Sequence, residues 1–193
     1  MTATAIHWFF SADDIDLPAL SVYLDSIDSL ARVREVRSLT AQEQARLFDA
    51  AEGFRPLNLS CFVPSDTPPM TEVIHYGRNS LPALRLFEKR FCNVSAEGVQ
   101  VCGYNEQPAR LVTGPGYFSV WQATEFEVAI DYTQLPMAKP ASWPAVLPNS
   151  ARLGRWIYDG TLDIVRGISN RVVIGRATRA GVPLDNWFVL CRA

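Results

Sequence analysis

Two short stretches of the chain contain residue types that can do chemistry. In the first, His75 can titrate near neutrality without help from its surroundings. With a carboxylate from a neighbouring strand, Asp131 or Glu127, it would form a general base, so His75 and Asp131 are the candidate catalytic residues. Strand alternation places His75 on the same face as the apolar Val73. A hydrogen-bonded core histidine is therefore the competing interpretation.

The second stretch combines an aromatic hydroxyl with charged groups. Tyr158 adjoins a turn, so its hydroxyl can reach the interior from a strand end. Asp163 and Arg166 lie three residues apart and would form a surface ion pair if the segment were helical. Alternatively, the planar guanidinium of Arg166 points at a carboxylate or phosphate in a cavity. Tyr158 and Arg166 are therefore candidate ligand-binding residues.

The order of residues from Tyr158 to Gly175 resembles a known group of proteins. It has a Tyr-Asp pair, a second acid, an arginine, a short polar turn and an apolar strand that ends in glycine. This pattern is similar to the C-terminal part of uncharacterised bacterial GxWxG-type lipocalin-like proteins, although the GxWxG signature is absent here. The resemblance covers only this segment. It implies a barrel with an interior cavity and no settled activity.

Two aromatic residues complete the predicted pocket. Tyr104 ends a strand-like run beside a turn, where barrels place ligand contacts. Trp143 lies in the proline-rich segment 133–150, a long loop that a buried tryptophan would order. We therefore predict ligand contacts from Tyr104 and Trp143. The groups expected around one cavity at the end of the barrel are His75, Tyr104, Asp131, Tyr158 and Arg166.

The first quarter of the chain is predicted to be helical. Residues 16–36 repeat leucines at the three-four spacing of one helix. A second helix is predicted over 41–52, where Thr40 and Glu43 form a capping box.

The rest of the chain is rich in short strand patterns. The strands are predicted at 72–76, 99–104, 109–113, 117–123, 126–132, 171–178 and 187–192, with 87–94 ambiguous between helix end and strand. A short helix is expected after Asn79, and prolines make 56–71 a loop. The short turns between successive strands favour antiparallel neighbours. These patterns predict a single α+β domain over 1–193, helical in 1–55 and β-rich in 56–193. Its sheet is mainly antiparallel and curved, or a lipocalin-like β-barrel with N-terminal helices.

Composition excludes several classes of protein. Apolar residues make up 48% and charged residues 20% of the chain, as in an ordinary globular protein. A net charge of −2 argues against nucleic acid as a partner, and no apolar run has the roughly 18 residues of a membrane span. Met1 to Phe10 lacks the basic start of a secretory signal. Four scattered cysteines without a CxxC spacing indicate free thiols, no zinc site and a cytoplasmic location.

Two functions remain open at this point. The aromatic content favours a barrel that encloses a small, largely apolar or amphipathic molecule, with a carboxylate or carbonyl as its head group. Cofactor-free acid–base chemistry is an extension of this hypothesis, and no cofactor or metal is expected. The alternative is a protein-interaction module without a small-molecule site, in which the amphipathic helices at 16–52 form the docking surface. An enclosed cavity with converging polar groups would favour the first.

Overall fold

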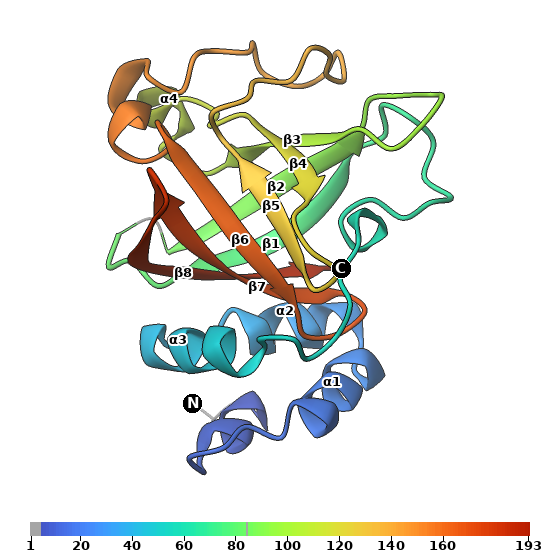
Figure 1. Ribbon diagram of the computed structural model, residues 1–193, viewed down its shortest axis with the longest axis vertical. Helices are drawn as coiled ribbons and strands as arrows, with labels where there is room; N and C mark the ends of the chain where they lie inside the picture. The colour runs from blue at the N-terminus through green and yellow to red at the C-terminus, as the bar shows by residue number, and fades with distance from the viewer. Residues whose placement is uncertain (1–4, 84) are drawn as a thin grey trace.

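Within the residues that the structure describes, 5–83 and 85–193, eight strands form a closed barrel (Figure 1). In this computed structural model each strand pairs antiparallel with the next along the chain, and β8 pairs with β1. The predicted antiparallel barrel with N-terminal helices is confirmed. The strands are β1 (Val73–Asn79), β2 (Leu86–Asn93), β3 (Val101–Glu106), β4 (Phe118–Gln122), β5 (Glu127–Asp131), β6 (Thr161–Gly167), β7 (Val172–Arg179) and β8 (Val182–Arg192).

The N-terminal helices cover one side of the barrel. Figure 1 shows α2 and α3 lying along the outer face of β7 and β8, with α1 below them in this view. Their leucines share an apolar cluster with outward-facing residues of these strands, such as Ile174 and Val189. The helical segments are η1 (Ala5–Phe10), α1 (Leu17–Ser26), α2 (Ser29–Val36), α3 (Ala41–Ala50), η2 (Leu59–Cys61), α4 (Arg110–Thr113) and η3 (Arg152–Trp156).

The predicted helix 16–36 is two helices. Ile27 is extended, and the side chain of Asp28 accepts a hydrogen bond from the backbone N–H of Ala31. This cap starts α2 in a new direction, and the leucine spacing alone did not reveal it. The predicted capping box of Thr40 and Glu43 is present at the start of α3.

Two other local predictions are wrong. Asn79 ends β1 instead of starting a helix, because its side chain accepts from Leu81 N–H in a turn and Ser80 is hydrogen-bonded to Trp187 of β8. Segment 109–113 is not a strand but contains the one-turn helix α4. There Thr113 N–H donates to the Ala109 carbonyl.

Strand alternation separates the barrel interior from its outer face. In β6, Thr161, Asp163 and Val165 are buried while the residues between them are half-buried. In β5, Val128 and Ile130 point inward, as the alternation in 126–132 predicts. Aromatic and branched side chains fill most of the interior.

The segment before β1 closes one end of the barrel. Phe62, in the loop that follows η2, is fully buried and packs its ring 5.2 Å from that of Phe91. Val63 and Leu57 join the same interior cluster. The predicted loop 56–71 therefore acts as a plug, and the opposite end is the one at which an internal cavity lies.

Candidate functional site

A cavity of about 90 Å³ lies inside the barrel, away from the plug. Its lining comes from the ends of strands and from the loop after η3. Residues from six strands and four connecting segments converge there, among them Asn79, Lys89, Tyr132, Ile157, Tyr158 and Asp163. A concave space with several convergent polar groups is the usual form of a ligand site.

The centre of this site is the amine of Lys89, a side chain that is only 2% exposed. Its Nζ donates to Asn105 Oδ1 at 3.1 Å and to the hydroxyl of Tyr132. It also lies 3.3 Å from Asp163 Oδ2, and this carboxylate is buried too. Strands β3 and β6 and the residue that follows β5 therefore deliver one polar group each to a single amine, which is costly to bury without such partners.

Aromatic rings surround the same amine. The ring centroids of Phe118, Tyr132 and Phe188 are 4.9–5.0 Å from Lys89 Nζ, and that of Phe87 is 5.8 Å away. Ring faces attract a cation, so this cage compensates in part for the water that the ammonium has lost.

Each phenylalanine of the cage lies over a glycine on the neighbouring strand. The cross-strand pairs are Gly77 with Phe87, Gly103 with Phe118, and Gly175 with Phe188. A Cβ at Gly77 or Gly103 would lie 2.6 or 2.5 Å from the partner ring, and a Cβ at Gly175 would also clash. Because glycine has no side chain, each of the three rings can lie directly against the backbone of the neighbouring strand. This leaves room for the Lys89 amine between the rings.

We predict that Gly175→Ala destabilises the protein by about 1–3 kcal/mol, because the new methyl group displaces the Phe188 ring. Gly98→Ala is the matched control, since a Cβ there meets no atom within 4 Å. Chemical denaturation of both variants measures the difference. Equal stabilities for the two variants would contradict the packing role of Gly175.

A second group of hydrogen bonds supports the rim of the cavity. Gln107 Nε2 donates to the hydroxyl of Tyr158 at 2.9 Å and to Thr113 Oγ1 at 3.0 Å. The ring of Tyr158 stacks on that of Tyr132, with centroids 5.4 Å apart. Asn105 Nδ2 donates to the Tyr132 hydroxyl and to the Gly116 carbonyl. This network fixes the two tyrosines beside the amine.

Burial shifts the pKa of each titratable group in the site. Burial lowers the pKa of the Lys89 amine, and the nearby Asp163 opposes that shift. Burial likewise raises the pKa of the Asp163 carboxyl against the opposing effect of Lys89. The pKa of Tyr132 is raised well above its ordinary value, again chiefly by burial, so its hydroxyl keeps its proton. Both members of the Lys89–Asp163 pair are thus displaced toward their neutral forms.

Two of the residues predicted for the site lie in the barrel interior. Tyr158 lines the cavity, as expected. His75 points into the barrel near the plug, where Nε2 is 3.0 Å from the Phe62 carbonyl and the ring packs 4.8 Å from that of Phe91. Burial lowers the pKa of His75 to about 3, so it is neutral near pH 7.

The other four predicted residues lie outside the barrel wall. Tyr104 packs against Trp143, with ring centroids 5.0 Å apart, in a cluster that fastens the 133–150 loop to the outside of β3. Asp131 accepts from Thr133 and Gln134 in the turn after β5. The structure does not bring these side chains to the cavity. Tyr104 and Asp131 each lie one position from inward-facing residues of their strands and so point outward, and Trp143 lies in the outer loop.

Arg166 fastens α3 to the barrel. It lies opposite Glu127 in the β5–β6 pair and donates to that carboxylate at 2.8 Å. It also donates to the Phe48 carbonyl at 2.9 Å and lies over the Phe48 ring. Asp163 and Arg166 are three apart in a strand rather than a helix, so they lie on opposite faces and do not pair.

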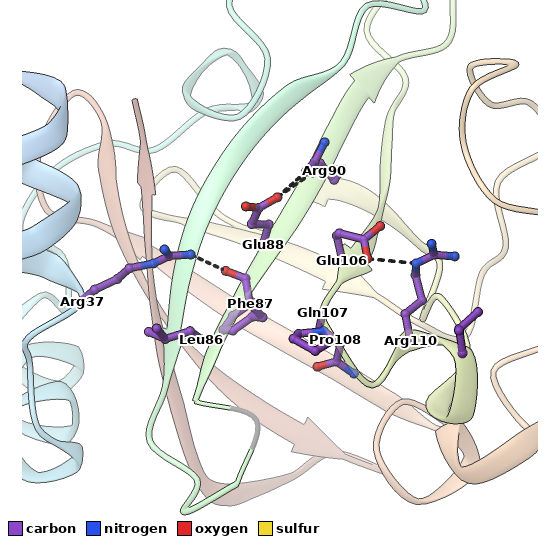
Figure 2. Close-up of a pocket in the computed structure, with 10 residues that line it drawn as sticks. Arg37, Leu86, Phe87, Glu88, Arg90, Glu106, Gln107, Pro108 and Arg110 are labelled. Carbon is purple, nitrogen blue, oxygen red and sulfur yellow. Dashed lines mark hydrogen bonds and ion pairs between the residues drawn. The ribbon is translucent and has the colours of Figure 1, made fainter.

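A larger hollow of about 520 Å³ lies on the outer surface near the same end of the barrel (Figure 2). Figure 2 shows that its charged side chains have partners within the protein. Arg90 pairs with Glu88, Arg110 Nε is 2.9 Å from Glu106, and Arg37 donates to the Phe87 carbonyl. With its charges satisfied in this way, the hollow offers less for a ligand than the buried amine does.

The central pair of the site, Lys89 and Asp163, was not predicted as a pair. One signal for Lys89 is present in the sequence, since Phe87, Lys89 and Phe91 alternate with Glu88 and Arg90. A lysine between two phenylalanines on one strand face is a buried charge, and buried charges need partners.

Comparisons with known proteins found no family model, curated protein or solved structure that matches the chain. In the described part of the chain, no helix is long and apolar enough to cross a membrane. The same residues contain no group of three or more His, Cys, Asp or Glu side chains that could hold a metal ion. The fold and the site define an antiparallel β-barrel with a buried lysine–aspartate pair beside an internal cavity.

Proposed function

We propose that this protein binds a small, largely apolar molecule inside the barrel, with a carbonyl or carboxylate head group at Lys89. The observation that carries the proposal is a fully buried amine that lines a cavity. A buried lysine–aspartate pair stabilises a fold less well than apolar side chains of the same volume would. Its presence beside empty space is therefore better explained by a ligand than by stability.

The size of the cavity limits the ligand. A water molecule has about 30 Å³ of liquid volume, so 90 Å³ suits a head group with a few carbon atoms. Of the interior aromatic residues, Phe87, Tyr132, Tyr158 and Phe188 line the cavity, and others such as Phe62 and Phe91 fill the core. Any longer apolar part of the ligand would extend past Leu81 and Ile157, which line the cavity on the side of the loops.

Acid–base chemistry without a cofactor is an extension of this proposal. Lys89 contacts both the Tyr132 hydroxyl and the Asp163 carboxylate, and all three groups can donate or accept a proton. Asp131 is absent from the cavity, and neutral, buried His75 lies near the plug, so the pair first suggested for this role has less support.

The alternative of a protein-interaction module rested on the helices at 16–52. Their apolar residues pack against β7 and β8, with Leu20, Leu24 and Leu47 at most 1% exposed. A docking role for those faces would require the helices to leave the barrel. This favours the small-molecule proposal.

Binding is tested by titrating the protein with short carboxylates, aldehydes and ketones of three to six carbons in a calorimeter. We expect at least one class to bind. The double variant Lys89→Met/Asp163→Asn should weaken that binding by roughly tenfold or more, because a hydrogen bond to a charged group contributes about 1.5–3 kcal/mol. Removing both charges leaves neither unpaired.

Lys139→Met is the control, since Lys139 lies in the outer loop and donates to the Trp143 carbonyl at 3.0 Å. It should bind like the unmodified protein. Native mass spectrometry of protein from its own host gives an independent check for a retained small molecule. Binding that is equal in the double variant and the control, or no binding of any probe and no retained molecule, would overturn the proposal.

A further inference from the structure

The basic residue in the barrel is of the kind that can lose its proton. The chain has sixteen arginines and two lysines, and Lys89 is one of the two. A guanidinium stays protonated in proteins, whereas a buried lysine amine readily becomes neutral and nucleophilic. The amine of Lys89 can therefore act as a nucleophile in the barrel interior, which an arginine at the same position could not do.

A proton acceptor for this amine is within reach. Asp163 Oδ2 lies 3.3 Å from Lys89 Nζ, and both side chains are nearly inaccessible to water. Burial lowers the pKa of Lys89 and raises that of Asp163. Transfer of the proton from nitrogen to Asp163 leaves a neutral amine among aromatic rings, and such desolvation is one way in which enzymes activate a lysine.

A proton donor lies on the other side of the amine. The Tyr132 hydroxyl contacts Lys89 Nζ and is itself held by Asn105 Nδ2 at 3.1 Å. Burial raises the pKa of Tyr132, so its hydroxyl is protonated and can act as a hydrogen-bond donor to an oxygen atom that forms next to the nitrogen. Both residues line the cavity, so a carbonyl group placed there would meet the amine and the hydroxyl together.

We propose that Lys89 forms a Schiff base with small aldehydes or ketones that enter the cavity. This rests on the proposed function, because the carbonyl compound must first bind. The nitrogen adds to the carbonyl carbon and one of its protons moves to the oxygen, which gives a carbinolamine. Tyr132 then protonates the departing hydroxyl, which leaves as water, and the remaining nitrogen proton returns to Tyr132. One water is released for each C=N bond formed, and no oxidant or reductant is consumed.

The test uses propanal with sodium cyanoborohydride at pH 7, followed by peptide mapping by mass spectrometry. Reduction converts the imine into a stable propyl group on the lysine. We expect Lys89 to be modified at least about tenfold faster than Lys139, since burial lowers the pKa of Lys89 and a desolvated lysine is an activated nucleophile. Carbon-13 NMR with propanal labelled at C1 detects the imine without requiring the hydride to enter.

Two variants separate this role from a structural one. Tyr132→Phe keeps the ring but removes the proton donor, and it should slow labelling of Lys89 by about a hundredfold while circular dichroism stays unchanged. Lys139→Arg should leave labelling of Lys89 unaltered.

The outcomes distinguish this inference from the binding proposal. Calorimetric binding of a carbonyl compound or carboxylate, with neither an imine signal nor preferential labelling of Lys89, would overturn the Schiff base and leave the binding function standing. Failure of every probe to bind, together with labelling at Lys139 and the N-terminus alone, would overturn both.

Discussion

Asp163→Ala is expected to lower the free energy of unfolding by about 3–5 kcal/mol at pH 7. The substitution leaves Lys89 buried with only neutral partners, Tyr132 and Asn105. The lysine can escape the cost of a buried charge by losing its proton. From an ordinary pKa near 10.4 this costs about 4.6 kcal/mol at pH 7, at about 1.36 kcal/mol per unit, which sets the upper end of the range.

The loss of unfolding free energy caused by Asp163→Ala depends on pH. The folded-state pKa of Lys89 is lowered, so above that value the unfolded chain binds more protons than the fold does. The penalty is complete below the folded-state pKa and disappears as pH rises toward the unfolded value. Denaturation of the Asp163→Ala variant at pH 7 and pH 9 should therefore show a smaller loss at pH 9.

Two comparisons make this prediction specific. Asp185→Ala removes a carboxylate that is 89% exposed in its pair with Arg176, so its effect should stay within about 0.5 kcal/mol. Lys89→Met/Asp163→Asn should recover much of the stability that Asp163→Ala loses, because no unpaired charge remains. A loss below about 1 kcal/mol for Asp163→Ala would show that Lys89 reaches water or is not charged in the fold.

The barrel could be predicted from the sequence because its signals are local. Alternation in 126–132 and the turn around Gly114 follow from a few neighbouring residues, and closure follows from the cost of leaving a sheet edge exposed. The site depends on relations between distant strands. Lys89 and Asp163 are 74 positions apart, and only the register of the strand pairs from β2 to β6 shows that they meet.

The wrong details have a common cause, which is an uncertain assignment of strand faces. The segment that holds Lys89 was ambiguous between helix and strand, so its inward face could not be chosen. The spacing of Asp163 and Arg166 predicts a surface pair only if the segment is helical, and the strand instead places them on opposite sides of the wall. The glycine–phenylalanine pairs are equally hidden, since Gly175 and Phe188 become partners only through the β7–β8 register.

Acidification from pH 7 to pH 5 is expected to destabilise the protein through His75. Burial lowers its pKa in the fold from 6.5 to about 3, an effect to which Arg192 on β8 contributes and which the hydrogen bond to the Phe62 carbonyl opposes. Within the described chain Nδ1 has no hydrogen-bond partner, so a second proton there would be buried without an acceptor. Between pH 6.5 and 3 the unfolded chain binds the proton and the fold does not. Stability therefore falls as pH falls.

The size of this loss of stability follows from the difference between the unfolded and folded pKa values of His75. At about 1.36 kcal/mol per unit, the loss approaches 2 kcal/mol by pH 5 and about 5 kcal/mol by pH 3. Asp163 has the opposite effect on stability as pH falls. Its pKa is raised in the fold, so the folded protein takes up this proton at a higher pH than the unfolded chain does. The effect of His75 is therefore measured as a difference between two proteins rather than from one pH profile.

The variant for this measurement is His75→Gln, whose amide can donate to the Phe62 carbonyl in place of Nε2. Its free energy of unfolding, followed by urea denaturation from pH 7 to 5, should depend less on pH than that of the unmodified protein by about 2 kcal/mol over the interval. His7→Gln is the control, since His7 is 32% exposed and lies beside Glu43 on the outer helices. Parallel pH profiles for His75→Gln and the unmodified protein would mean that His75 exchanges its proton with water, and that the plug formed by Phe62 does not close this end of the barrel.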